Sequence, residues 1–509
     1  MPKKLDRILG YLQHDDTEVP FFFSTDTFQL TLYPSASNEC GGFNLKAFER
    51  MADDSQKNKW AGNPEIEGIT SEGYRIVFCI SDIPTYKNSL IEYNVNWAFY
   101  WAGEHDVNAI EGIQISGEDV DRFYDPSRVL KRKTKINEET GGFEEFAVRA
   151  EKATSEDCGH YLMHLRNEDS YSGNKTSSDN KNESVNVQIE LSAYAMMKFH
   201  SNTPMSSTSR LNLSFDSPVN LDGMWQAFGQ AWNFFQYVTY RSGVKLDDLL
   251  AYWKDKEDRY IYQGRFLWRR LYSVGLLEEK DISPYEYVIP YDLLKEKVAA
   301  IFNMIDSGEF GFEHFCPTVS ARHHYGTGRI IEILTDFERE YRNIYGTNSL
   351  REAAFVEFRD DLVNELEQKR ESLHGKSKKW IKDFIKLLSN YDDAYKGRVV
   401  NALRDCKDIL SPFLQRDYKG DSDDIMQEIA ERAGQLRNDY AHSNLNVQLE
   451  PVHLTDLKTL ERLIYIIRFK KLGMDTVTIQ KAINEVFHEN MAFKASEEEK
   501  KAASQNAEK

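Results

Sequence analysis

An arginine, an asparagine and a histidine lie close together near the C-terminal end of the sequence. They are Arg437, Asn438 and His442. An arginine can hold a phosphate group through two hydrogen bonds and can stabilise negative charge that develops on it. A histidine can give or accept a proton near neutral pH, because its unperturbed pKa is about 6.5. Together these groups suit RNA cleavage without a metal, in which the 2′-hydroxyl group attacks the adjacent phosphate.

The spacing of these residues fits a helix. Asn438 and His442 are four positions apart, so they lie on one helical face. Arg437 and His442 are about 7.5 Å apart along the axis and about 140° apart around it. They can therefore border one cleft when a second helix lies alongside, but they cannot both touch one small atom. His442 ends the predicted helix, where the negative end of the helix dipole favours the imidazolium form.

A single histidine cannot act as acid and base at the same moment. Two copies of the motif that face each other across a two-fold axis would supply both groups. This mechanism therefore predicts a homodimer or a higher homo-oligomer, with RNA as the substrate.

The helix that carries the motif is amphipathic. Its apolar residues recur at three- and four-residue steps, and they are Met426, Ile429, Ala433, Leu436 and Tyr440. On such a helix, the pattern Arg437-Asn438-x3-His442 resembles the Arg-x4–6-His signature of the HEPN superfamily of helical ribonucleases. The neighbouring segments resemble the HEPN domain of ApeA-like anti-phage proteins, over residues 326–490. These segments are a predicted helix at 398–410, a loop with Pro412, and predicted helices at 457–473 and 475–487.

The resemblance implies a metal-independent endoribonuclease that needs no cofactor and acts in anti-phage defence by abortive infection. It assigns His442 as the general acid or base, Arg437 as the group that stabilises the phosphate, and Asn438 as the polar residue that follows the arginine. From the domain order alone, it also implies that the N-terminal part restrains or triggers the helical domain. A phage-derived molecule is then the candidate trigger.

Two other interpretations remain open at this point. Arg7 and His14 match the same loose pattern in a segment without a sustained helical stripe, and we interpret that match as chance. His442 could instead bond the free carbonyl groups of the helix end, with Arg437 paired to Asp439 or Glu431. The chain would then be a non-catalytic HEPN-type dimerisation or scaffold protein, whose β-rich half binds a phage or glycan ligand.

Three lysines recur every four residues in a second predicted helix. They are Lys378, Lys382 and Lys386, and Trp380 lies among them. Lysines in a row can guide an RNA backbone, so they are weak candidates for RNA binding. A solvated helix face is the more common meaning of such a row.

A group of histidines and a cysteine near residue 320 raises the question of a zinc site. Its members are His314, Cys316, His323 and His324. Their spacing matches no common structural zinc site, so we predict ordinary loop histidines and no bound metal.

The composition is that of a globular protein with more than one domain. Among its 509 residues, 82 are acidic and 64 are Lys or Arg, for a formal net charge of −18. Such a charge argues against a protein that coats nucleic acid by bulk electrostatics. There is no long apolar run, no secretion signal at the N-terminus, and no Cys-x-x-Cys pair among the five cysteines. We therefore predict a cytoplasmic protein without a membrane partner.

The hydrophobic patterns predict an α+β protein with several domains. Strands are expected at 20–34, 74–84, 91–103, 186–200 and 210–218. Helical spacing is assigned to 224–238, 247–256 and 265–277, and nearly everything from residue 329 onward is expected to be helical. The predicted domains are a β-rich sensor or regulatory domain at 1–220, a mixed, mainly helical connecting region at 221–325, an all-α HEPN-like bundle at 326–492 and a disordered tail at 493–509.

Overall fold

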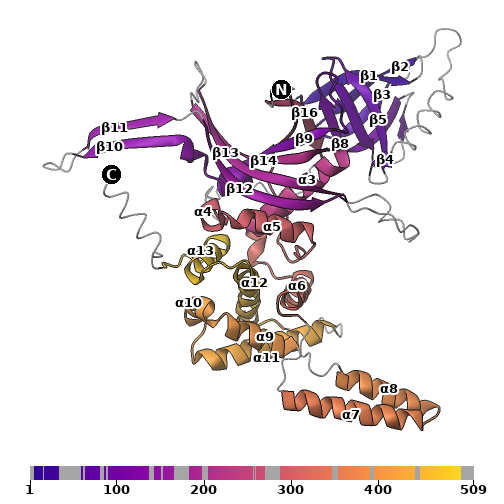
Figure 1. The fold of residues 1–509 in the computed structure, drawn as a ribbon, viewed down its shortest axis with the longest axis vertical. Helices are drawn as coiled ribbons and strands as arrows, with labels where there is room; N and C mark the ends of the chain where they lie inside the picture. The colour runs from indigo at the N-terminus through magenta and orange to yellow at the C-terminus, as the bar shows by residue number, and fades with distance from the viewer. Residues whose placement is uncertain are drawn as a thin grey trace. The chain divides into compact units, whose positions relative to one another are not determined.

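The computed structural model divides the chain into two compact units (Figure 1). The sheet unit contains Met1–Thr239, Gly243–Tyr285 and Pro290–Ser307, and the helical unit contains Tyr240–Ser242, Glu286–Ile289 and Gly308–Lys509. The structure describes residues 5–14, 17–33, 59–60, 63–80, 85–87, 90–136, 143–150, 153–165, 183–197, 205–255, 257, 259–269, 287–346, 353–389, 395–441 and 448–493.

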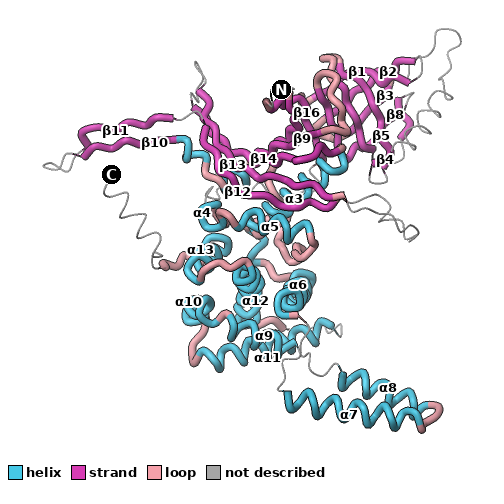
Figure 2. Tube along the Cα trace, viewed as in Figure 1, coloured by secondary structure: helices cyan, strands magenta, loops and turns pink. Residues whose placement is uncertain are grey.

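Antiparallel strands dominate the described part of the sheet unit (Figure 2). The larger sheet contains β1 (Arg7–His14), β2 (Thr17–Ser24), β3 (Gln29–Leu32), β4 (Lys59–Trp60), β5 (Asn63–Thr70), β6 (Arg75–Ile80), β7 (Thr85–Lys87), β8 (Leu90–Trp101), β9 (Ile110–Ser116), β12 (Ala153–His164), β13 (Ser184–Met197), β14 (Met205–Val219), β15 (Asp248–Lys254) and β16 (Tyr260–Trp268). A separate two-stranded sheet pairs β10 (Leu130–Ile136) with β11 (Phe143–Ala150). The strands predicted at 74–84, 91–103, 186–200 and 210–218 are confirmed where these residues are described, whereas the predicted 20–34 segment forms two strands, β2 and β3, separated by a turn at 25–28.

Strand pairing closes a ring in the first part of the sheet. β8, β3, β2, β1 and β5 follow one another, and β6 pairs with both β5 and β8. Alternate side chains of these strands form one apolar core, which includes Phe23, Leu30, Phe78, Val95 and Tyr100. The alternation of apolar and polar residues in the sequence thus predicts the buried face correctly, because successive strand residues point to opposite faces.

The structure corrects two predicted helices. Residues 248–254 form β15, which pairs with β9 and β16, and Tyr260–Trp268 form β16, which pairs with β8. Both helix predictions were therefore wrong where the segments are described. The physical reason is that a short apolar run fits a buried strand as well as a helix, and only the neighbouring strands decide between them. The expected connecting region at 221–325 is thus divided between the two units, and it supplies two strands to the sheet.

The sheet unit also contains short helices and one long one. They are α2 (Glu118–Phe123), η1 (Pro126–Val129), α3 (Leu221–Thr239), α4 (Tyr291–Leu294) and α5 (Lys297–Asp306). The prediction of a helix at 224–238 is confirmed by α3, which packs against β9, β14 and α5. Apolar side chains line the buried face of α3, and Phe234 and Phe235 are fully buried there.

The helical unit confirms the predicted helical run. It contains η3 (Ser320–His323), α6 (Thr327–Tyr345), α7 (Ala353–Glu371), α8 (Lys376–Ser389), α9 (Tyr395–Asp405), α10 (Lys407–Asp417), α11 (Ser422–Ala441), α12 (Pro451–Lys471) and α13 (Thr476–Phe487). α6 ends at Gly346, whose φ of 77° lies in the left-handed region that glycine adopts without strain. α12 is buried along much of its length and packs against α6, α11 and α13.

Pro412 lies inside α10 and not in a loop, which corrects another sequence prediction. The predicted helix at 398–410 is also divided, because α9 ends at Asp405 and α10 begins at Lys407. A proline within a helix lacks the N–H that would bond the carbonyl four residues earlier. Here that carbonyl belongs to Asp408, and the side chain of Gln480 donates a hydrogen bond to it at 3.3 Å. α13 thus satisfies the acceptor that Pro412 leaves open, so the helix persists.

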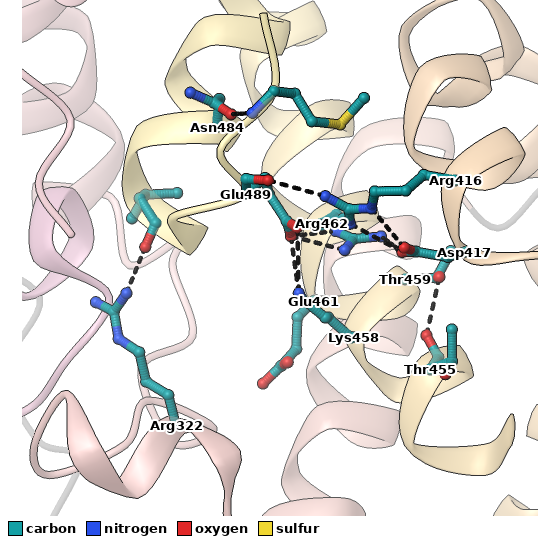
Figure 3. A network of polar contacts seen from close by, with 12 residues as sticks. Arg322, Arg416, Asp417, Thr455, Lys458, Thr459, Glu461, Arg462, Asn484 and Glu489 are labelled. Carbon is teal, nitrogen blue, oxygen red and sulfur yellow. Dashed lines mark hydrogen bonds and ion pairs between the residues drawn. The ribbon is translucent and has the colours of Figure 1, made fainter. Parts of the chain in front are cut away.

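A network of buried charges holds the described C-terminal helices together (Figure 3). The Glu489 carboxylate accepts hydrogen bonds from Arg462 at 2.8 Å, Arg416 at 2.6 Å and Lys458 at 3.2 Å. Arg462 also donates to Asp417 at 2.7 Å, and the side chains of Arg462 and Glu489 are 0% and 1% exposed. Because a buried charge is costly without partners, this mutual pairing is what permits the network to be buried.

Within the described residues, no helix is long and apolar enough to cross a membrane. Four of the five cysteines are described, and Cys79, Cys158, Cys316 and Cys406 are all buried and form no disulfide bond among the described residues. The predicted tail at 493–509 lies outside the described residues except for Phe493.

Candidate active site

Helix α11 places Arg437 and Asn438 on its exposed side. The residues predicted to pack inward are all buried, and they are Met426, Ile429, Ala433, Leu436 and Tyr440. α11 packs against α6, α9 and α12 through this stripe. Arg437 and Asn438 do not belong to the stripe and are exposed. The apolar face therefore orients the helix so that the two polar residues reach solvent.

The two residues line a cavity with a volume of about 470 Å³. Helices α6, α9 and α11 supply its walls, and the lining residues are Glu338, Tyr395, Lys396, Glu431, Gly434, Gln435, Arg437 and Asn438. The predicted requirement that a second helix lies beside the arginine is met by α6 and α9. A smaller cavity of about 240 Å³ lies against α6, and Glu338 lines that cavity as well.

Three arginines from three helices surround the Glu338 carboxylate. Arg342 and Arg398 both donate hydrogen bonds to its Oε1 atom, at 2.9 Å and 2.6 Å. The Nη2 atom of Arg437 is 3.6 Å from Oε2, which is an ion pair but too long for a hydrogen bond. Glu338 is one negative charge among three positive ones, so an anion in the cavity would meet a positive potential.

Arg437 differs from Arg342 and Arg398 because its N–H groups make no hydrogen bond to Glu338. Among the described residues, its guanidinium makes the Glu338 ion pair and no hydrogen bond, and its side chain is 43% exposed. The side chain of Arg398, by contrast, is 3% exposed and tightly bonded. The N–H groups of Arg437 are thus open to an incoming anion, because no described side chain or backbone group occupies them.

Tyr395 lines the cavity and carries a fully buried hydroxyl group. Its hydroxyl group is buried and has no hydrogen-bond partner in the described part of the chain, and the residue is 7% exposed. Burial, and next the nearby Glu338 carboxylate, raise the pKa of Tyr395 well above its usual range, although Arg437 acts in the opposite direction. The hydroxyl therefore keeps its proton and can donate it in a hydrogen bond. An unbonded buried donor is costly unless a ligand or water satisfies it.

The rim of the cavity carries a second ion pair. Lys396 of α9 donates a hydrogen bond to the carboxylate of Glu431 on α11. Both side chains are about half exposed or more, so this ion pair lies at the surface. The alternative pairing of Arg437 with Glu431 is therefore wrong for this structure, since Glu431 bonds Lys396 and Arg437 faces Glu338. Asp439, the other expected partner, accepts a hydrogen bond from Gln435 at 3.0 Å.

His442 lies outside the described residues, one position after the last residue of α11. The structure therefore brings Arg437 and Asn438 to one cavity and leaves the predicted role of His442 as a prediction. The chance match at the N-terminus lies in a strand, because Arg7 and His14 are the two ends of β1. That context differs from the helix that the motif requires.

The other candidate residues lie elsewhere. Lys378, Lys382 and Lys386 are exposed on α8 and do not line the cavity. By helical geometry, these lysines lie on the side of α8 opposite Trp380, so they do not form one surface with the indole ring. Their RNA-binding role stays a prediction.

The residues considered for zinc have other partners. His314 bonds the Asp336 carboxylate through Nδ1 at 2.5 Å, and it is 1% exposed. The Cys316 thiol donates to the Tyr240 carbonyl oxygen at 3.3 Å, while His323 and His324 are exposed. Within the described residues, no group of three or more potential ligands could hold a metal ion.

Sequence reasoning missed the residues that surround Arg437. Glu338, Tyr395, Lys396 and Arg398 come from segments about 40 to 100 positions earlier, and no motif marks them. One local signal was present, since Glu338 and Arg342 have the four-residue spacing of a helical ion pair. That spacing is too common in an acidic chain to identify a site.

Comparisons with known proteins identified no related protein. A scan with profiles of known families found no match, and searches of curated proteins and of solved structures found none either. The resemblance to HEPN ribonucleases therefore depends on the motif and the order of helices in this sequence alone.

Proposed function

We propose that the helical unit is a metal-independent endoribonuclease of the HEPN type that acts in anti-phage defence. The observation that carries the proposal is the Arg437 guanidinium, which is exposed in a cavity and makes no hydrogen bond with a described residue. An exposed guanidinium that makes one long ion pair and no hydrogen bond suits a phosphate oxygen, because its N–H groups would gain charge-assisted hydrogen bonds.

In the proposed reaction, the phosphate to be cleaved enters the cavity and is held by Arg437, with the Asn438 amide as a neighbouring donor. His442 of one copy takes the proton of the 2′-hydroxyl group as the oxygen attacks the phosphorus. His442 of a second copy gives a proton to the departing 5′-oxygen. The products are a 2′,3′-cyclic phosphate and a 5′-hydroxyl group, and Arg437 stabilises the extra negative charge of the pentacovalent intermediate.

The proposal includes a homodimer or higher homo-oligomer, a cytoplasmic location and control by the sheet unit in response to a phage-derived trigger. The four described cysteines, buried and without a disulfide bond, support a reducing compartment.

The test compares the wild-type chain with Arg437→Ala and His442→Ala, both in cells and after purification. We expect growth arrest and RNA fragments that end in 2′,3′-cyclic phosphate for the wild type, in EDTA as well as without it. Both substitutions should abolish cleavage, while Arg404→Ala, an exposed arginine on α9 that does not line the cavity, should not.

Cleavage that survives both substitutions, or that EDTA abolishes, would refute the proposed mechanism. Identical growth of the wild type and His442→Ala with intact RNA, with and without phage infection, would favour the non-catalytic scaffold.

A further inference from the structure

An exposed ion pair joins two walls of the cavity that contains Arg437. Lys396 lies on α9 and Glu431 on α11, and both line the cavity. Their side chains are 45% and 61% exposed, and among the described residues the Lys396 ammonium group makes no other hydrogen bond or ion pair. An exposed ion pair contributes little to stability, because water screens the attraction and solvates both charges when they separate. Lys396 is therefore able to exchange its partner at little cost.

Lys396 approaches α11 at Gly434, midway between Glu431 and Arg437. A Cβ atom added to Gly434 would lie 3.5 Å from the Cβ atom of Lys396, so the two helices are close at this point. Glu431 and Arg437 are three positions before and after Gly434, which is about 4.5 Å along the helix axis in either direction. The long, flexible stem of a lysine spans such a distance. The Lys396 ammonium group can thus extend toward Glu431, as it does here, or toward Arg437.

The described charges of the cavity favour an anion as the second partner. Lys396 and Arg437 balance Glu338 and Glu431 among the lining residues, and two further arginines bond Glu338. The group therefore contains four cations and two carboxylates, so an anion that enters it meets a positive potential. Glu431 is the more exposed carboxylate, at 61% against 20% for Glu338, and water solvates it when Lys396 moves away.

The other charged residues close to this site in sequence do not enter that count. Arg432 bonds Asp456 and Glu428, and it does not line the cavity. Asp439 accepts a hydrogen bond from Gln435 and does not line the cavity either. These two residues of α11 carry opposite charges. The pair at 392–393, which precedes α9 and is acidic, lies outside the described residues.

We propose that Lys396 is a second phosphate-binding residue of the cavity, and that Glu431 holds its ammonium group until RNA enters. This inference rests on the proposed ribonuclease function and adds a binding residue to it. With RNA bound, Lys396 donates a hydrogen bond to a non-bridging oxygen of the phosphate that Arg437 contacts. The negative charge that develops on this phosphate during cleavage is then shared between cations of two helices.

Two neutralising substitutions with opposite expected effects test the exchange. In the full-length chain that also carries His442→Ala, fluorescence anisotropy measures the binding of a labelled single-stranded RNA of mixed sequence. Lys396→Gln should weaken binding by roughly 5-fold, whereas Glu431→Gln should tighten it by roughly 3-fold, because the lysine loses its competing carboxylate. The slope of log K against log salt concentration should decrease in magnitude by about 0.7 in Lys396→Gln, since one phosphate contact is lost.

Cleavage by the chain that retains His442 is the second measurement. Lys396→Gln should lower kcat/KM by roughly 10- to 100-fold, a smaller loss than in Arg437→Ala, because an ammonium group is a point charge and not a bidentate fork. Lys396→Arg should recover most of this loss, since it keeps the cation.

The ion pair of Lys407 with Asp423 is the matched control. It joins α10 to α11 at 2.8 Å, its side chains are 42% and 62% exposed, and neither residue lines the cavity. Lys407→Gln and Asp423→Asn should therefore leave RNA binding and cleavage unchanged.

Two outcomes would overturn the inference. They are equal RNA binding and cleavage in Lys396→Gln and Lys407→Gln, and equal weakening in Lys396→Gln and Glu431→Gln, which would make the pair a structural contact. Failure of the proposed function is recognised separately, because the wild type would then cleave no RNA. In that case the rise in melting temperature with inorganic pyrophosphate in EDTA tests the exchange. The rise should be smaller in Lys396→Gln and larger in Glu431→Gln, and an equal rise in both would refute it.

Discussion

Two places in the helical unit have the same composition, one carboxylate surrounded by three basic side chains, but differ in burial. Glu489 is contacted by Arg416, Lys458 and Arg462, and Glu338 is contacted by Arg342, Arg398 and Arg437. The Glu489 side chain is 1% exposed and that of Glu338 is 20% exposed.

The difference lies in what each cation is free to do. At Glu489, each of the three cations is within 3.2 Å of a carboxylate oxygen, and because Arg462 and Glu489 are 0% and 1% exposed, separating these two would leave a charge buried and unpaired. At Glu338, two arginines hold the carboxylate and Arg437 stays 3.6 Å away in a cavity. The first cluster therefore joins helices, while the second presents a spare cation. The same residue types become structure or candidate chemistry according to whether each cation is closely bonded to a carboxylate that is itself buried.

The largest expected effect is the loss of stability on Arg462→Met. The substitution leaves Glu489 and Asp417 buried with one cation fewer, which costs about 3–5 kcal/mol for a buried pair. Urea unfolding followed by circular dichroism would measure it, with Arg404→Met as an exposed control. A loss below about 1 kcal/mol would mean that the buried network contributes little to the fold.

Arg437→Ala should change the stability of the fold very little and should greatly reduce RNA cleavage. Its long, exposed ion pair is worth at most about 1 kcal/mol, so the unfolding curve should hardly move. Cleavage of RNA should fall by roughly 100- to 1000-fold, the usual result of removing one donor to a developing negative charge. Arg342→Ala is the matched control, because Arg342 bonds the same carboxylate but lines only the smaller cavity. A smaller effect of this variant on cleavage would show that an arginine must line the larger cavity to act on RNA. Equal losses in both variants would contradict the distinction.

Glu338→Gln tests whether this carboxylate competes with a phosphate for Arg437. RNA binding, measured by fluorescence anisotropy in a chain that also carries His442→Ala, should tighten by about 5-fold, because one negative charge near the ligand is removed. Some stability should be lost as well, since the buried Arg398 loses the charge of the carboxylate that it bonds. Glu428→Gln, an exposed residue of α11 outside the cavity, should leave binding unchanged. Weaker binding would show that Glu338 positions Arg437 instead of competing for it.

The smallest expected effect is a loss of thermal stability at acidic pH. Burial raises the pKa of Glu489, but Arg462, Lys458 and Arg416 outweigh it and lower that pKa; burial of Asp417 is likewise outweighed by Arg416 and Arg462. A carboxylate with a lowered pKa stabilises the fold above its unfolded value of about 3.9–4.3, and this contribution disappears as pH falls through the folded pKa. The melting temperature of the chain should therefore fall between about pH 5 and pH 3. The fall should be shallower in Arg462→Met, and an identical slope in both proteins would exclude these groups as its cause.

The sequence alone determined most helices and part of the strands of this protein, among them β6, β8, β13 and β14, while β1, β5, β9 and β12 were not predicted. The stripe on α11, the end of α6 at Gly346 and the alternation in β8 are local patterns, because each repeats with the period of its own element. The same periodicity predicted that Arg437 and Asn438 lie on the outer side of a helix. It failed for β15 and β16, where a run of about seven to nine residues suits either element.

Only the tertiary structure decided what surrounds Arg437. Glu338, Tyr395 and Arg398 come to the cavity because the buried stripes of α6, α9 and α11 pack together, and side chains distant in sequence then share one wall. Tertiary packing likewise kept Pro412 within a helix, since α13 supplies the missing donor through Gln480. Local spacing determines which face of an element is apolar, but the partners of a charge depend on contacts between elements, and those have no period in the sequence.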